Sequence, residues 1–146
     1  NKKEIKKVIS SRIQIRIIGK ISKLPIKIRS TLKDTVKFTK KNKKIIVNLA
    51  INYGSKDEIV NAIKKLKNKN KISKKILEKN FYTYNLSDPD ILIRTGGHRR
   101  LSNFMLWQLA YTEIYFLDKL WPDFNSNDFK KVINNYKKIK RNFGSI

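Results

Sequence analysis

The chain has 146 residues, and 35 Lys and Arg stand against 11 Asp and Glu, which gives a net charge of +24. Hydrophobic residues make up 40% of it, enough for a folded core rather than a disordered polycation. The lack of cysteine excludes disulfides, thiolate metal sites and a cysteine nucleophile, and the single histidine excludes a His-rich metal cluster. No apolar run approaches the roughly 20 residues that span a membrane, and no signal peptide is recognisable, so we expect a cytoplasmic protein.

The first half of the chain predicts alternating helices and strands: the end of a basic helix at 2–10, a strand at 13–18, a helix from Pro25 to about Lys41, a strand at 44–52, a helix after Ser55 and a short helix at about 73–79. The strand at 44–52 is almost continuously apolar, which is typical of a strand covered on both faces. Ser55 is expected to cap the helix that follows it.

The second half continues the alternation with a turn at 87–90, a buried strand at 91–93, a helix from Ser102 to about Tyr111, a strand at 113–116, a loop at 121–124 and a last helix to about Asn142. Asn127 or Asp128 is expected to cap that last helix, with Phe129 and Val132 facing inward. Strands alternating with helices indicate an α/β fold with an open, mostly parallel sheet flanked by helices. We expect residues 1–146 to form a single domain.

The segment after the strand at 91–93 has the composition of a phosphate site, and ligands of parallel sheets bind beyond the carboxyl ends of strands. Arg94 and Arg100 supply planar charged groups that match phosphate oxygens. The glycine pair 96–97 lets a ligand approach the backbone, and Ser102 is expected to cap a helix whose N-terminus attracts anions. A basic surface loop with an ordinary helix cap is the alternative.

Glu113 lies at the edge of an apolar stretch, where an unpaired charge is unfavourable. It either pairs with one of the arginines or holds Mg²⁺ beside a phosphate. His98 is expected to be exposed. The aromatic residues of this region are expected in the core: Phe104, Trp107, Trp121 and Phe124.

Four runs in this half closely resemble the cis-prenyltransferase family, which includes the undecaprenyl diphosphate synthases: DILIRTGG at 90–97, RLSNFMLWQLAY at 100–111, EIYF at 113–116 and LWPDF at 120–124. NLAINYG at 48–54 and RIIG at 16–19 match earlier landmarks in the same order. The resemblance extends from about Ile13 to Gly144.

The resemblance implies a transferase, usually a homodimer, that adds isopentenyl diphosphate units to an allylic prenyl diphosphate and makes cis double bonds. It implies that Arg94, Arg100 and Ser102 bind isopentenyl diphosphate and that Glu113 helps hold Mg²⁺. Asn52 is expected to support the site from a neighbouring strand end, and Ile46 and Leu49 are candidate walls of a product tunnel. A long polyprenyl diphosphate used as a lipid carrier is the expected product. Peripheral membrane contact is compatible with this product, and no nucleic acid is expected as a partner.

The chain also departs from the family pattern, because the early Asp-Gly-Asn motif with its metal-binding aspartate does not occur in it. We therefore expect a C-terminal fragment of the catalytic domain that lacks two sheet strands, exposes apolar sheet surface and cannot catalyse prenyl transfer alone. His98 replaces the usual Glu, Ser55 replaces a Gly, and Arg141 lies one place too early for the family's Arg-x-Gly. The alternatives are a non-catalytic subunit of a two-component synthase and a basic nucleic-acid-binding module.

Overall fold

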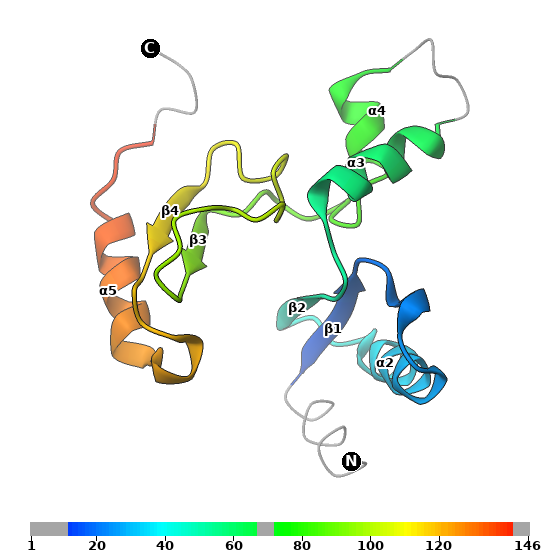
Figure 1. Cartoon of the computed structure of the whole chain (residues 1–146), viewed down its shortest axis with the longest axis horizontal. Coiled ribbons are helices and arrows are strands. Elements are labelled where there is room, and N and C mark those ends of the chain that lie inside the picture. The colour runs from blue at the N-terminus through cyan, green and yellow to red at the C-terminus, as the bar shows by residue number, and fades with distance from the viewer. Residues whose placement is uncertain (1–11, 67–71, 142–146) are drawn as a thin grey trace. The chain divides into compact units, whose positions relative to one another are not determined.

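The computed structural model describes residues 12–66 and 72–141, and its contacts divide the chain into two compact units, residues 1–85 and 86–146 (Figure 1). The helix end predicted at 2–10 lies outside the described residues. The first unit contains β1 (Ile13–Ile18), η1 (Ile21–Lys23), α2 (Ile26–Thr39), β2 (Ile45–Ala50), α3 (Ser55–Lys64) and α4 (Lys74–Glu78). The second unit contains β3 (Ile91–Arg94), β4 (Glu113–Phe116), η2 (Trp121–Asp123) and α5 (Ser126–Tyr136).

Parallel strand pairing is present in both units, which confirms the predicted α/β class. β1 pairs with β2 from Ile13↔Ile45 to Ile18↔Ala50, and β3 pairs with β4 from Ile91↔Glu113 to Arg94↔Phe116. The described strands thus form two sheets of two strands each. The length and β-branched composition of β1 made this strand predictable to the residue.

The buried residue of α2 is a threonine that bonds to β1. The Thr39 side chain is fully buried, and its hydroxyl accepts a hydrogen bond from the Ile15 N–H at 3.0 Å and donates one to the Thr35 carbonyl at 2.8 Å. The expected helix after Pro25 is confirmed. The C-terminal end of α2 is fixed on β1, because the Thr39 hydroxyl accepts the hydrogen bond of the Ile15 N–H, which points away from β2.

The expectation that β2 is covered on both faces is wrong. Ile45 is 50% exposed, and Ile46 and Leu49 are each 39% exposed. Among the described residues β1 is the only strand neighbour of β2, and α2 packs on β1. The apolar composition of β2 therefore did not ensure its burial. The expected exposure of apolar sheet surface is confirmed. Side chains alternate along a strand, so Ile46 and Leu49 lie on opposite faces, and only one of them is able to line a given tunnel wall.

The helix α3 begins differently from the prediction. Gly54 occupies the N-cap position, and Ser55 is the first helical residue with a fully buried side chain, so Ser55 is not the cap. Near it the buried carboxylate of Glu58 accepts hydrogen bonds from the Tyr53 hydroxyl at 2.6 Å and from the Tyr82 N–H at 2.8 Å. These two bonds offset the desolvation of the carboxylate and tie α3 to the segment after α4.

The aromatic and apolar residues around α5 are less buried than expected. Trp121 is 72% exposed and stacks on Phe124, with ring centroids 5.8 Å apart, so its assignment to the core is wrong. Phe129 is exposed as well, whereas Val132 is buried as predicted. The helix ends at Tyr136 rather than near Asn142, which lies outside the described residues.

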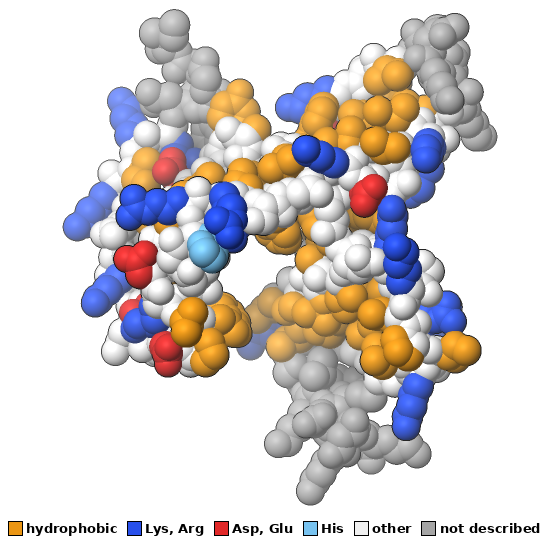
Figure 2. All heavy atoms as spheres, in the orientation of Figure 1, with side chains coloured by type: hydrophobic (Ala, Val, Ile, Leu, Met, Phe, Trp, Pro, Cys, Tyr) orange, Lys and Arg blue, Asp and Glu red, His pale blue; other side chains and the backbone are white. Residues whose placement is uncertain are grey.

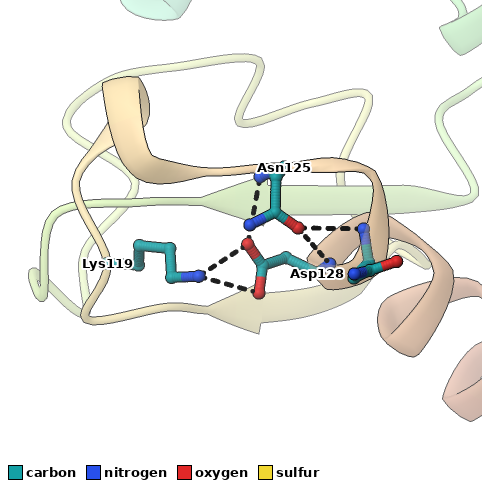
Figure 3. A network of polar contacts seen from close by, with 4 residues as sticks. Lys119, Asn125 and Asp128 are labelled. Carbon is teal, nitrogen blue, oxygen red and sulfur yellow. Dashed lines mark hydrogen bonds and ion pairs between the residues drawn. The ribbon is translucent and has the colours of Figure 1, made fainter.

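The cap of α5 is Asn125, not Asn127 or Asp128. The Asn125 side-chain oxygen accepts hydrogen bonds from the N–H groups of Asn127 and Asp128, and the Asp128 carboxylate accepts one in return from the Asn125 N–H at 3.0 Å (Figure 3). Such a reciprocal capping box satisfies amides that the first helical turn leaves free. Lys119 adds an ion pair to Asp128 at 2.8 Å, which links the loop after β4 to the helix.

The hydrogen bond from Lys119, followed by that from the Asn125 backbone, lowers the pKa of Asp128 below its ordinary value of 3.8. The folded state therefore favours the carboxylate. This stabilisation is complete above about pH 4 and is lost as the pH falls through the lowered pKa.

We expect Asn125→Ala to lower the free energy of unfolding by about 1 kcal/mol, because the first turn of α5 loses its side-chain acceptor. Urea denaturation followed by far-UV circular dichroism measures this loss. Asn127→Ala is the matched control, since Asn127 contributes only its backbone N–H to the cap, and its effect should stay within about 0.5 kcal/mol. Equal losses in the two variants would contradict a capping role for Asn125.

Candidate functional site

Arg94 is the last residue of β3 and lies where the predicted phosphate site begins. Its Nη1 donates a hydrogen bond to the Ser102 hydroxyl at 3.1 Å and another to the backbone carbonyl of Arg100. The structure thus brings together the three residues predicted to bind a diphosphate. Both bonds use Nη1, which leaves the Nε and Nη2 donors of the guanidinium for a ligand.

A hollow of about 360 Å³ opens beside Arg94. Its lining residues are two polar ones and four apolar ones: Arg94, Thr95, Leu92, Ile93, Leu101 and Phe104. This mixture suits a small ligand with an anionic head and a short hydrocarbon tail.

The glycine pair turns the loop but does not offer its amides to a ligand. Gly96 and Gly97 have φ values of +91° and +73°, and their N–H groups donate to the carbonyls of Lys119 and Leu117 at 2.9 and 3.0 Å. The space around the Gly96 Cα is open, because a Cβ added there would meet no atom within 4 Å. Close approach of a ligand therefore remains feasible, although these two amides do not supply the anion contacts.

The helix predicted from Ser102 to Tyr111 is absent, and the segment forms successive turns. Ser102, Asn103 and Met105 have φ values of +49°, +62° and +45°, which a right-handed helix cannot accommodate. Ser102 is therefore not a helix cap, and no helix dipole contributes at this point. Its hydroxyl serves as the acceptor that orients Arg94 instead.

Three basic residues of this loop, His98, Arg99 and Arg100, are exposed, as expected for His98. Only the backbone of Arg100 is held, through its carbonyl, so its guanidinium is presented on the exposed surface next to the hollow-lining Leu101. The site thus has one positioned arginine and a second one at its rim.

Glu113 does not join this cluster within its own unit. It opens β4 opposite Ile91, whereas Arg94 pairs with Phe116 at the other end of the same two strands. Three residues of strand separate these positions by about 10 Å, and the alternation of side chains places Glu113 and Arg94 on opposite faces. No described Lys or Arg forms an ion pair with Glu113, so the alternative of a salt bridge to an arginine is not realised among the described residues.

A magnesium site made by this chain alone is not found in the described part, where no three His, Asp or Glu side chains gather. Glu113 nevertheless fits one role in such a site, as a half-buried carboxylate without a described cationic partner. Mg²⁺ is commonly bound by one or two carboxylates together with substrate phosphates.

Asn52 belongs to the first unit, whose placement relative to the second is not determined. Its side-chain amide donates to the Lys20 carbonyl at 3.2 Å, and the Lys20 N–H donates to the Asn52 carbonyl at 3.2 Å. Asn52 thus fastens the ends of β1 and β2, and its role in a binding site stays a prediction.

Arg141 is a residue whose position the sequence patterns did not reveal. Its guanidinium contacts the Asp90 carboxylate, the Tyr136 hydroxyl at 2.8 Å and the Tyr111 carbonyl at 2.8 Å. The contact with Asp90 raises the pKa of Arg141 above its ordinary value. These contacts join the segment after α5 to the residue before β3. The two segments are 51 residues apart, so local sequence patterns do not predict the contact.

A family model for undecaprenyl diphosphate synthase, named Prenyltransf, matches residues 1–144 of the chain. Isoprenyl transferase from Oceanobacillus iheyensis is 41% identical over 95% of the chain and 58% of its own length, and isoprenyl transferase from Rickettsia prowazekii is 39% identical over 98% and 64%. The chain thus spans less than two thirds of the length of these relatives.

Two solved structures are similar to the chain over 98% of its length. A probable undecaprenyl diphosphate synthase from Campylobacter jejuni has a TM-score of 0.86 at 34% identity and is covered over 68% of its length. Lavandulyl diphosphate synthase from Lavandula x intermedia, in complex with dimethylallyl diphosphate, has a TM-score of 0.89 at 33% identity and is covered over 66%.

Proposed function

Because the chain belongs to the undecaprenyl diphosphate synthase family of cis-prenyltransferases, we propose that the protein containing it condenses isopentenyl diphosphate with an allylic prenyl diphosphate. The product is a cis-polyprenyl diphosphate that serves as a lipid carrier. The observation that carries the proposal is the hollow at Arg94, in which a positioned guanidinium adjoins a small apolar surface. That combination matches the charged head and the five-carbon tail of isopentenyl diphosphate.

In this proposal Arg94, Arg100 and Ser102 bind the diphosphate of the isopentenyl unit. Nε and Nη2 of Arg94 form charge-assisted hydrogen bonds to phosphate oxygens, while Nη1 keeps the guanidinium in place through Ser102. The apolar hollow-lining residues, Leu92, Leu101 and Phe104, receive the hydrocarbon part. The double bond of the isopentenyl unit is thereby directed at the allylic carbon, where a C–C bond forms as the C–O bond to pyrophosphate breaks and a proton leaves.

Glu113 would hold Mg²⁺ as one of its oxygen ligands. When bound, the ion neutralises the charge that builds on the departing pyrophosphate. Asn52 would support the site from the end of β2, and one of Ile46 and Leu49 would line the tunnel for the growing chain.

We also propose a homodimer and a peripheral contact of this cytoplasmic enzyme with the membrane that receives its product. The dimer is supported by the position of Glu113, at the opposite end and on the opposite face of β3 and β4 from its own Arg94. A carboxylate so placed is better situated to serve the site of a second copy. Two-fold dimers supply such reciprocal contacts as a matter of symmetry.

Mixing two inactive variants tests whether sites are shared between copies. Arg94→Ala and Glu113→Gln should each abolish most activity, whereas co-refolded mixtures should recover about a quarter of the wild-type rate, because half of the dimers then carry one intact site. Incorporation of labelled isopentenyl diphosphate measures this recovery. A mixture as inactive as its components would place Arg94 and Glu113 in the same copy's site.

The activity itself is tested with the whole protein, an allylic diphosphate primer and labelled isopentenyl diphosphate. We expect elongation that stops on chelation of Mg²⁺, with the product length read by chromatography after removal of the diphosphate. No incorporation with any allylic primer, despite binding of isopentenyl diphosphate, would instead assign the protein to a non-catalytic subunit of a two-component synthase.

A further inference from the structure

The segment from Arg12 to Lys44 carries an extreme local excess of positive charge, with twelve Lys and Arg against one acidic residue, Asp34. Six of its lysines follow one another along α2 and the turn after it, and we call them the α2 basic surface: Lys33, Lys37, Lys40, Lys41, Lys43 and Lys44. Within the described ranges none of these six forms an ion pair. No ion pair within the described chain therefore neutralises their charge. The one carboxylate on the same helix is that of Asp34.

Two hollows border the α2 basic surface, and they differ in character. One, of about 440 Å³, combines three of the lysines with three apolar side chains, Ile17, Ile21 and Val36. The other, of about 500 Å³, is lined by cations and one amide: Arg12, Lys41, Asn42, Lys43 and Lys44. A basic hollow next to a partly apolar one is complementary to a ligand that has an anionic head and a hydrocarbon tail.

Exposed apolar side chains also occur on α2. Phe38 is 58% exposed and precedes Lys41 by three residues, about one helical turn, and Ile26 at the start of α2 is 76% exposed. Figure 2 shows basic and apolar side chains next to one another over this part of the first unit. An exposed aromatic side chain close to lysines is typical of helices that lie in the plane of a membrane interface.

The backbone below the α2 basic surface is fixed. Gln14 donates to the Lys40 carbonyl at 2.9 Å, Asn42 donates to the Ile13 carbonyl at 2.8 Å, and the buried Thr39 binds Ile15. The lysines after α2 thus emerge from a turn anchored on β1, so binding a partner orders only their side chains and costs little backbone entropy.

We propose that the α2 basic surface docks on the anionic headgroups of a lipid bilayer, with Phe38 entering the interface. None of the described helices is long and apolar enough to cross a bilayer. Nucleic acid would also attract the lysines, but the exposed Phe38, one helical turn before Lys41, favours lipid. This inference names the surface for the peripheral contact proposed above, and its test requires no prenyl transfer.

Co-sedimentation with vesicles tests the proposal on the whole protein. We expect binding at least about tenfold tighter to phosphatidylcholine vesicles with about 30% phosphatidylglycerol than to pure phosphatidylcholine. The triple variant Lys41→Gln, Lys43→Gln, Lys44→Gln should lose at least about tenfold of that binding. The matched control Lys130→Gln, Lys137→Gln, Lys138→Gln removes the same charge from exposed positions at and after α5 and should lose less than about threefold.

A second variant separates lipid from nucleic acid. Phe38→Ser should weaken vesicle binding about tenfold while leaving its salt dependence unchanged, because it removes apolar contact and no charge. Equal losses in the two lysine triples, or equal binding to neutral vesicles, would overturn the proposal. The proposal would also be overturned if duplex DNA displaced the vesicles and bound the Phe38→Ser variant as tightly as the wild type. Unchanged affinity for isopentenyl diphosphate in these variants distinguishes loss of docking from loss of the proposed activity.

Discussion

Replacing Arg94 by alanine is expected to weaken the binding of isopentenyl diphosphate about 100-fold, which corresponds to about 3 kcal/mol. Arg94 is oriented in the unbound protein by Ser102 and by the Arg100 carbonyl, so its remaining donors meet the diphosphate without further ordering. Hydrogen bonds between charged partners contribute about 1.5–3 kcal/mol each, and alanine removes at least one of them together with the charge. Isothermal titration calorimetry with the whole protein measures the affinity.

Two further variants separate charge from geometry at this position. Arg99→Ala removes the same charge from an exposed neighbour and should change the affinity less than about threefold. Arg94→Lys keeps the charge but loses the planar fork and the bond to Ser102, so we expect a loss of about tenfold. If Arg99→Ala weakens binding as much as Arg94→Ala does, the loop acts through its net charge and Arg94 has no special position.

Gly19→Ala is expected to lower the free energy of unfolding by more than about 3 kcal/mol, the largest effect on stability that we predict for a single substitution. Gly19 follows β1 with φ +104°, and an added Cβ would lie 2.3 Å from the Ile51 carbonyl oxygen and 3.0 Å from the Tyr53 Cβ. The Ile51 backbone is not free to move away, because its N–H donates to the Ile18 carbonyl at 2.9 Å. Relief of the clash would therefore open the ends of β1 and β2, where Lys20 and Asn52 are also joined.

Gly96→Ala provides the control for this effect. Gly96 has a similar φ of +91°, but an added Cβ would meet no atom within 4 Å, so only the backbone strain of about 1–2 kcal/mol applies. Denaturant unfolding of the two variants measures the difference, which isolates the steric clash. Equal destabilisation by the two substitutions would show that the strand ends yield to the added methyl group.

The residues of the candidate site were predictable from the sequence, but the backbone conformation that positions them was not. Arg94, Arg100 and Ser102 belong to a strand end followed by glycines and arginines, which is a recurrent anion site, and the structure brings these residues together. The predicted helix after Ser102 was wrong, because apolar spacing at 102–111 does not report the positive φ values at Ser102, Asn103 and Met105. Amides of a helix N-terminus therefore do not contribute to the candidate site at this point.

The extent of β1, β4 and most of α2 is predictable from the sequence, because β-branched alternation and helical spacing depend on residues close together in the chain. The motif runs likewise determined the family, which the match over residues 1–144 confirms. Three features depend on packing between segments far apart in the chain and are visible only in the fold: the exposure of β2, the contact of Arg141 with Asp90 and the separation of Glu113 from Arg94. Burial and register depend on which distant segment packs against a strand, and local composition carries no information about that partner.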